Sequence, residues 1–299
     1  MKNDRASDTA VLIARSLLLL EATPRFRPLL PPDSARLTRI LLPATSRTGW
    51  FEICLRHRIT RQLLFSAERF FLPGIFLHYH VRKLELAEFV RSSHAAGIRQ
   101  LVVLGAGLDT LAWRHALATD ACCFELDHPA TQEVKRRALH HEVRKPELLA
   151  ADLMRDSPSD LLRNQALFDP SAPVAVVAEG LLMYFPVHRV RELMHDLSMI
   201  AAPGSRFAFT FMEARAGKPL AFHHARPAVN SWLRARQEPF RWGIERPHVA
   251  SFITEQGWEL DRLSSPDDFR SRHLAPRGLA NAQLAIGESI AFAHKPATA

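Results

Sequence analysis

The chain has 299 residues, and 47% of them are apolar, which is enough to bury one sizeable core in a single enzyme domain. Its net charge of +8 comes mainly from arginines that are scattered along the sequence rather than clustered beside aromatic residues, which argues against a nucleic-acid-binding face. The sequence holds three cysteines, two of them adjacent, and no apolar run of the roughly 18 residues that span a bilayer, so we expect a cytoplasmic protein without disulfides that binds neither nucleic acid nor membranes.

The first 95 residues have the apolar spacing of helices, with frequent proline interruptions. Proline removes a backbone donor and clashes with the preceding turn, so each interruption ends a helix. We therefore predict several short helices that form an N-terminal cap, followed over 84–90 by a helix that leads into the first strand. The interruptions fall at Pro24, Pro28, Pro31, Pro32, Pro43 and Pro73.

The segment Leu101–Arg114, LVVLGAGLDTLAWR, carries the strongest functional signal. Its apolar run predicts a buried parallel strand, and this strand runs into the turn Gly105-Ala106-Gly107. Neither glycine has a Cβ, so the backbone can approach a ligand closely, and in an open α/β sheet nucleotide-like ligands bind at this carboxyl end of the strands. The turn therefore predicts a site for an adenosine-bearing cofactor.

The residues after the turn favour one cofactor over another. A dinucleotide fingerprint has a third glycine where this chain has Thr110, and the chain contains no phosphate-binding P-loop motif. Asp109, inside the turn, suits an ammonium group better than a pyrophosphate. Because S-adenosylmethionine carries an amino group and a sulfonium but no phosphate, we predict it in preference to NAD, which stays the alternative.

Two acids follow the turn at a spacing that is typical of a ribose contact. The apolar run 121–126 predicts a second strand, which is interrupted only by Glu125 and ends at Asp127. In a βαβ unit, an acid about 20 residues past the glycine turn binds the ribose hydroxyls. Glu125 lies 20 residues and Asp127 lies 22 residues after Gly105, so both stay candidates.

The next two strands also end in acids. Residues 148–151 predict a third strand that ends at Asp152-Leu153, and Val174–Ala178 predicts a fourth that ends at Glu179. Three successive strands with terminal acids give one edge of the sheet a polar rim, which a ribose, an adenine amine and an amino-acid moiety require.

The remaining sequence completes a doubly wound α/β sheet. Residues 207–211 predict a fifth strand, and the last two strands are predicted as an antiparallel pair over 257–260 and 289–293. We expect a single domain with a helical N-terminal cap at 1–95, a cofactor-binding core at 96–212, a helical insertion at 213–250 and C-terminal strands at 251–299. The cap and the insertion would together roof the pocket.

Four linked segments, LVVLGAGLDTLAWR, FELDHP, ADLMRD and AEGLLMYFP, have the order and approximate spacing of the leucine carboxyl methyltransferase family, which the chain resembles from Tyr79 to Phe211. This family consists of class I S-adenosylmethionine-dependent methyltransferases. It includes an enzyme that methylates the C-terminal leucine carboxylate of a protein phosphatase, and many bacterial O-methyltransferases that esterify small carboxylic acids. The chain departs from the family at Leu111, where members often have arginine.

The resemblance implies a Rossmann-like sheet of seven strands, S-adenosylmethionine as cofactor and a small-molecule carboxylic acid as methyl acceptor. The alternatives are an acceptor hydroxyl, a protein C-terminal carboxylate or, less favoured, the chemistry of an NAD-linked oxidoreductase. A carboxylate is already ionised at neutral pH, so its methylation needs alignment and desolvation rather than a general base. The sequence leaves the oligomeric state open.

The resemblance also implies roles for individual residues. Arg82 lies 23 residues before Gly105, where family members carry an arginine that grips a carboxylate of the acceptor or of the cofactor. Tyr184 would present a substrate-facing hydroxyl, and these two are the predicted catalytic residues. The histidine pairs lack neighbouring metal ligands, so we predict no metal site. The predicted cofactor-binding residues are Arg82, Gly105, Ala106, Gly107, Asp109, Glu125, Asp127, Asp152, Leu153 and Glu179, with Asp127 at the ribose in preference to Glu125.

Overall fold

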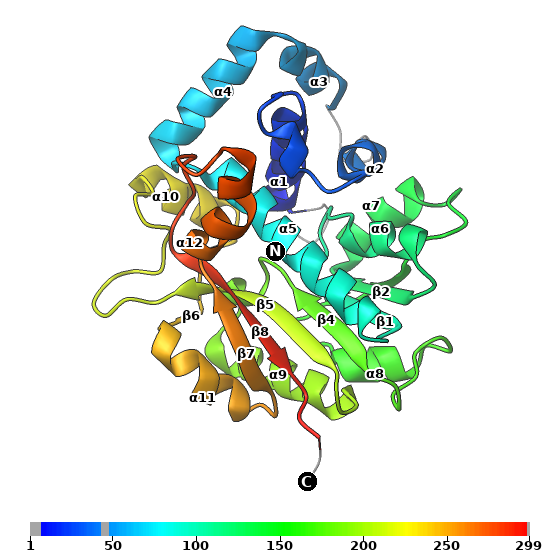
Figure 1. Ribbon diagram of the computed structural model, residues 1–299. Coiled ribbons are helices and arrows are strands. Elements are labelled where there is room, and N and C mark those ends of the chain that lie inside the picture. The colour runs from blue at the N-terminus through cyan, green and yellow to red at the C-terminus, as the bar shows by residue number, and fades with distance from the viewer. Residues whose placement is uncertain (1–6, 43–47, 298–299) are drawn as a thin grey trace.

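The computed structural model describes residues 7–42 and 48–297, which fold around one mostly parallel sheet (Figure 1). The strand order is β3-β2-β1-β4-β5-β8-β7, and a short eighth strand, β6, pairs with β5. Strands β1 to β5 run parallel, whereas β8 is antiparallel to both of its neighbours. The strands are β1 (Gln100–Leu104), β2 (Cys122–Asp127), β3 (Glu147–Ala150), β4 (Val174–Ala178), β5 (Arg206–Glu213), β6 (Gly243–Ile244), β7 (Glu259–Ser264) and β8 (Glu288–His294).

Helices cover both faces of the sheet, which explains the unbroken apolar runs of the central strands. All five residues of β1 and of β4 are buried. One face packs against α8 (Pro158–Arg163), α9 (Val187–Ile200) and α11 (Val249–Thr254). The other face packs against α5 (Ile75–Ala95) and α6 (Leu111–Ala118), and Figure 1 shows α5 crossing it. The predicted doubly wound α/β class is confirmed.

The N-terminal part consists of several helices, as the prolines predicted. These are α1 (Asp8–Glu21), α2 (Ser34–Leu41), α3 (Thr48–Arg56) and α4 (Arg58–Phe71), and they gather at one end of the molecule in Figure 1. The predicted interruption at Pro43 lies outside the described residues. The helix expected over 84–90 is longer, because α5 starts directly after Gly74, whose φ is +78°. A Cβ on Gly74 would lie 2.6 Å from the backbone of Gln283, so glycine permits this close approach.

The segment 213–250, expected to be helical, also contributes a strand. It contains α10 (Pro227–Ala235) and the two-residue β6, which extends the seven-stranded path to eight strands. Gly243 of β6 pairs with Met212 of β5, and a Cβ on Gly243 would lie 2.7 Å from the Met212 carbonyl oxygen. The missing side chain therefore lets this segment return to the sheet beside the carboxyl end of β5.

The last two strands form the predicted antiparallel pair, but no tight hairpin joins them. The chain between β7 and β8 forms α12 (Pro266–Phe269) and the short helical turns η5 (Arg270–Leu274) and η6 (Ala275–Arg277). The remaining helix, α7 (Pro129–Ala138), contacts β2 and β3. Among the helices of the described ranges, none is both long and apolar enough to cross a bilayer.

Candidate functional site

A cavity of about 470 Å³ lies at the carboxyl ends of the parallel strands. The strand ends and α5 line this cavity together with α1, the turn η3 (Leu182–Tyr184) and the segment 237–241. Every predicted site residue except Glu125 lines this cavity. Because these residues come from six different segments, the topology of the sheet brings them together, as expected for the crevice of a doubly wound fold.

The glycine turn after β1 adopts a backbone conformation that side chains rarely permit. The φ of Gly105 is +62° and that of Gly107 is +52°. A Cβ on Gly105 would lie 2.6 Å from a methyl carbon of Leu181, and one on Gly107 would lie 3.3 Å from Ala10 of α1. Both glycines therefore also allow neighbouring segments of the chain itself to pack closely, a requirement that the motif alone did not show.

Asp127 is the acid of β2 that reaches the cavity. Its carboxylate accepts hydrogen bonds from the backbone N–H groups of Gly107 and His128, both at 2.5 Å. Burial raises the pKa of Asp127 above its ordinary value, although these two N–H groups favour the charged form. The carboxylate thus joins the glycine turn to the second strand at the place where a ribose contact is expected.

Glu125 lies two residues deeper in the same strand and does not reach the cavity, so its predicted cofactor contact is wrong. Its carboxylate lies 2.5 Å from the ammonium of Lys135 on α7, and both side chains are 1% exposed. Lys135 also donates to the backbone carbonyl of Asp109 at 2.9 Å. Lys135 thus links Glu125 to the backbone of the glycine turn. Spacing along the sequence could not distinguish Glu125 from Asp127, because alternate residues of a strand lie on the same face.

A cluster of buried charges forms the floor of the cavity. The Arg82 Nε and Nη2 atoms donate to Glu179 at 3.0 and 2.7 Å, and Nη1 donates to both carboxylate oxygens of Glu288 at 2.7 Å. Lys83 donates to Asp109 at 2.7 Å and to Glu179 at 3.0 Å. The guanidinium fork that we predicted to hold a ligand carboxylate is therefore occupied by two glutamates of the protein.

Two members of this charge cluster were not identified from the sequence. Lys83 directly follows Arg82, and such a basic pair on the helix before the glycine turn was an available signal. Glu288 stands at the start of β8, 206 positions from Arg82, and only the antiparallel return of that strand brings the two together. No local pattern marks a pairing of this kind.

The cations of the cluster keep its buried carboxylates Asp109 and Glu288 in the charged form. Burial by itself would raise the pKa of Asp109, but Lys83 and Arg114 hold it well below its ordinary value. Burial likewise opposes ionisation of Glu288, whereas Arg82 lowers its pKa to about 2. Arg82, Lys83 and Arg114 thus balance Asp109, Glu179 and Glu288, and the further carboxylate of Asp127 lines the same cavity, which suits a cofactor that carries an ammonium and a sulfonium. The residues present therefore fit S-adenosylmethionine.

The other predicted residues lie around this cluster. Asp152 and Leu153 line the cavity just beyond β3, where we expected the adenine. Tyr184 of η3 also lines the cavity, and its ring lies 5.7 Å from that of Phe240. Burial raises the pKa of the Tyr184 phenol well above its usual value, so the hydroxyl stays protonated at neutral pH and can donate a hydrogen bond.

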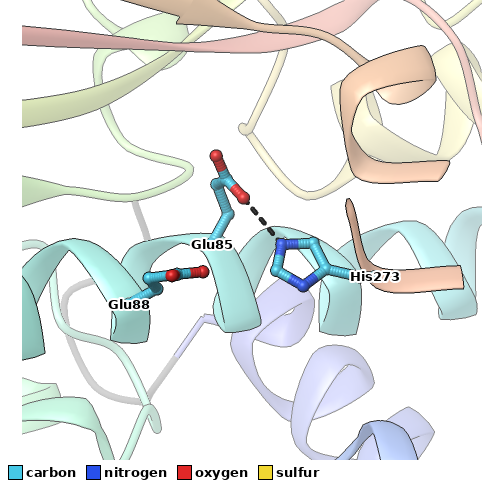
Figure 2. Close-up of side chains that lie close together, drawn as sticks. All are labelled: Glu85, Glu88 and His273. Atoms are coloured by element: carbon cyan, nitrogen blue, oxygen red, sulfur yellow. Dashed lines mark hydrogen bonds and ion pairs between the residues drawn. The ribbon is translucent and has the colours of Figure 1, made fainter. Parts of the chain in front are cut away.

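Outside the cavity, Glu85, Glu88 and His273 lie close together in a pattern that resembles a metal site (Figure 2). The Glu85 carboxylate, however, accepts hydrogen bonds from Arg262 at 2.8 Å and Arg272 at 2.7 Å, and lies 2.6 Å from the His273 ring nitrogen. Two guanidinium groups already neutralise this carboxylate. The cluster therefore fastens α5 to β7 and η5, and the positive neighbours disfavour a metal cation.

The chain matches proteins of known family. The sequence model of the leucine carboxyl methyltransferase family matches residues 37–198. A protein of Mycolicibacterium vanbaalenii is 31% identical over 215 residues, which are 66% of this chain and 66% of that protein, and one of Mycobacterium sp. strain JLS is 33% identical over 205 residues, 66% of this chain and 67% of that one. Both carry the provisional name S-adenosyl-L-methionine-dependent methyltransferase. The chain thus spans about two thirds of the length of these relatives.

The fold has a counterpart among solved structures. A crystal structure of a protein from Thermobifida fusca, provisionally named a methyltransferase, superposes with a TM-score of 0.57 at 19% identity, covering 88% of this chain and 94% of that one. This likeness shows the fold, and the family model and the named relatives show an S-adenosylmethionine-dependent methyltransferase. Within that class, the chain belongs to the leucine carboxyl methyltransferase family.

We expect Asp127→Ala to weaken binding of S-adenosylhomocysteine by roughly 10- to 150-fold, because it removes a charged acceptor from a buried site. Isothermal titration calorimetry measures this dissociation constant. The exposed Asp160, on α8 and away from the cavity, provides the control Asp160→Ala. An unchanged dissociation constant in a folded Asp127→Ala protein would contradict the assignment.

Arg82→Ala should lower the free energy of unfolding by about 3–5 kcal/mol, because it leaves two buried carboxylates without their cation. Arg82→Lys should recover only part of the loss, since one ammonium does not reproduce the planar fork that contacts both glutamates. Urea denaturation at pH 7 measures both effects. Wild-type stability of Arg82→Ala would show that Glu179 and Glu288 do not depend on this arginine.

Glu85→Gln should lower the free energy of unfolding at pH 7 by about 1–3 kcal/mol, since four partners lose their charged acceptor. Burial opposes the charge of Glu85, but His273, Ser264 and Arg262 lower its pKa from 4.5 to about 2. Ionised Glu85 therefore stabilises the native state fully above pH 4.5. The difference in free energy of unfolding between Glu85→Gln and wild type should shrink as the pH falls from 4.5 towards 2. Urea denaturation at several pH values measures it.

Glu88→Gln is the matched control, because the Glu88 side chain is 53% exposed on the same helix and should change the stability by less than about 0.5 kcal/mol. A rise in melting temperature with added Zn²⁺ or Mn²⁺ that Glu85→Gln abolishes would instead identify a metal site.

Proposed function

We propose that the protein transfers the methyl group of S-adenosylmethionine to a carboxylate oxygen of a small organic acid. The single observation that carries the proposal is the cavity itself, which is lined both by the acidic strand ends and by α1 with the segment 237–241, where we expect the acceptor to bind. Membership of a carboxyl methyltransferase family supports a carboxylate as the acceptor group. The roof formed by α1 supports a small molecule rather than a protein terminus.

The residues would divide the work of binding. Asp127 would hold the ribose hydroxyls, Asp152 and Leu153 would border the adenine, and Asp109 with Glu179 would face the ammonium of the methionine end. Arg82 and Lys83 hold Glu179 in position by hydrogen bonds, and Lys83 also holds Asp109. In this arrangement Arg82 acts mainly as a positioning residue, and its remaining N–H can reach a cofactor carboxylate.

The chemistry needs little from the protein besides alignment. The bound cofactor supplies an electrophilic methyl group, which bonds to the acceptor oxygen as sulfur regains the electron pair of the broken C–S bond. No proton is transferred, because the attacking carboxylate is already ionised. The apolar residues of α1 exclude water from the anion, and Tyr184 can orient it by donating a hydrogen bond.

A hydroxyl acceptor is the second candidate. Glu238 lines the cavity and carries a carboxylate that could accept the proton of an alcohol or phenol. That carboxylate already accepts hydrogen bonds from the hydroxyls of Ser7 at 2.7 Å and Thr9 at 2.5 Å. We favour the carboxylate acceptor because Glu238 is engaged in joining α1 to the insertion. An NAD-linked oxidoreductase is disfavoured by the acids at the turn.

We also propose a cytoplasmic location. All three cysteines, Cys54, Cys122 and Cys123, have free thiols, which supports a reducing compartment.

The function is tested by incubating the protein with radiolabelled S-adenosylmethionine and the sodium salts of benzoic, phenylacetic, cinnamic and octanoic acids. The expected product is a methyl ester, which mild alkali hydrolyses to volatile labelled methanol. A methyl ether formed on a hydroxyl survives that treatment, so benzyl alcohol and phenol serve as comparison acceptors. Labelled product from the alcohols alone would contradict the carboxylate proposal.

The pH dependence should also distinguish the acceptors. With an ionised carboxylate, kcat/KM should stay level between about pH 6 and 9, because the acceptor titrates near 4 and the Tyr184 phenol titrates well above 10. A hydroxyl that must lose its proton would give a rate that rises with pH. Initial rates in constant-ionic-strength buffers measure the profile, and a tenfold rise per pH unit would favour the hydroxyl.

A further inference from the structure

Part of the cavity lining lies outside the region that matches the family. The match covers residues 37–198, and this region includes the glycine turn, all the strand-end acids and η3. The start of α1 and the segment 237–241, which also line the cavity, lie beyond those bounds. Because enzymes that share a cofactor can differ in their acceptors, we expect acceptor specificity to reside in these two segments.

The cations that line the cavity differ in whether a carboxylate of the described protein lies beside them. Among the described residues, four lysine or arginine side chains line it: Arg82, Lys83, Arg155 and Arg241. Arg82 and Lys83 pair with the buried carboxylates of the floor. Arg155 lies 3.9 Å from Asp152. The Arg241 guanidinium makes no hydrogen bond or ion pair with any residue in the described ranges, so its charge is available to a ligand.

The backbone around Arg241 is firmly held. The N–H groups of Arg241 and Trp242 both donate to the Met183 carbonyl, at 2.8 and 3.2 Å. The Trp242 ring is 4% exposed and packs 5.5 Å from that of Phe252. Gln237, which also lines the cavity, has a φ of +62°, a strained conformation for this residue type. The segment is therefore fixed at both ends beside η3.

Tyr184 lies next to this segment and has an unused donor. Its ring packs against Phe240, the residue before Arg241, with the ring planes at 34°. Within the described chain, the Tyr184 hydroxyl has no hydrogen-bond partner. Ile13 of α1 belongs to the same apolar cluster as Tyr184 and Phe240. One guanidinium, one phenol and the apolar side chain of Ile13 thus line the same cavity.

The carboxylate that the segment 237–241 contributes to the cavity is already committed. Glu238 accepts hydrogen bonds from Ser7 and Thr9 through its two oxygens. Glu238 therefore binds α1, and no carboxylate of the described residues pairs with Arg241. A carboxylate is the group that an arginine fork recognises best, and a phenolic O–H adds a further donor.

We propose that Arg241 binds the carboxylate of the methyl acceptor, with Tyr184 donating to the same group, and that the acceptor is an organic acid with an apolar body lying against Ile13. This inference rests on the proposed function and names the substrate class and the anchor residue. Methylation converts the anion into a neutral ester, so Arg241 would bind the substrate more tightly than the product. Loss of this ion pair on methylation would favour release of the ester product.

The test uses Arg241→Ala in the full-length protein with whichever of the four acid salts named above the wild type methylates. KM for the acid should rise by roughly 10- to 150-fold, whereas the dissociation constant of S-adenosylhomocysteine and the melting temperature should stay within error of wild type. Arg241→Lys should restore part of the affinity, because it returns the charge without the fork. Tyr184→Phe should raise KM by a smaller factor.

The matched control is Arg234→Ala, an exposed arginine of α10 in the same insertion that does not line the cavity. It should behave as wild type. The primary amides of the same acids, tested as inhibitors, should bind wild type and Arg241→Ala equally weakly, because they lack the charge.

The outcomes separate this inference from the proposed function. Wild-type KM in Arg241→Ala, with base-labile ester still formed, would overturn the anchor and leave carboxyl methylation intact. A parallel loss of S-adenosylhomocysteine affinity would place Arg241 at the cofactor and also overturn it. Absence of ester from the wild type with every acid would overturn the proposed function, and the inference with it.

Discussion

The ion-pair cluster around Arg82 is the interaction on which the site depends. It joins α5 to the end of β4 through Glu179 and to the start of β8 through Glu288. Removing charges from water is costly unless the pairing is close and complete, and here each carboxylate accepts at least two hydrogen bonds. The cavity floor is therefore fixed by a helix and two strands rather than by loops, which gives the acids a defined orientation.

The roof of the cavity depends on contacts of a different kind. Ser7 and Thr9 donate to Glu238, and Arg236 lies 3.3 Å from Asp8. These polar contacts join the first helix to the insertion, more than 200 positions later. They are partly exposed and individually weak, so the roof is expected to separate more readily than the floor. We therefore expect the cofactor-binding floor to be more rigid than the roof.

Local sequence patterns predicted the sheet well because its strands are short apolar runs that end in polar residues. The predicted strand Val174–Ala178 has the observed bounds, and the turn at Gly105 lies where the motif placed it. The two-residue β6 was missed, since Gly243 and Ile244 show no strand pattern and join the sheet only through close approach to Met212. Glu125 was assigned to the cofactor for a related reason, since no local pattern shows that Lys135 of α7 pairs with it away from the cavity.

The sequence by itself determined the α/β class, the cofactor and the strand-end acids, because apolar periodicity and glycine turns act over a few neighbouring residues. Only the tertiary structure decided how the charges pair. It directed two edges of the Arg82 guanidinium to Glu179 and Glu288, and within the described ranges it gave the Arg241 guanidinium no hydrogen-bond or ion-pair partner. Such pairings join residues that are distant in the chain, and their free energy arises from burial and geometry that no local pattern contains.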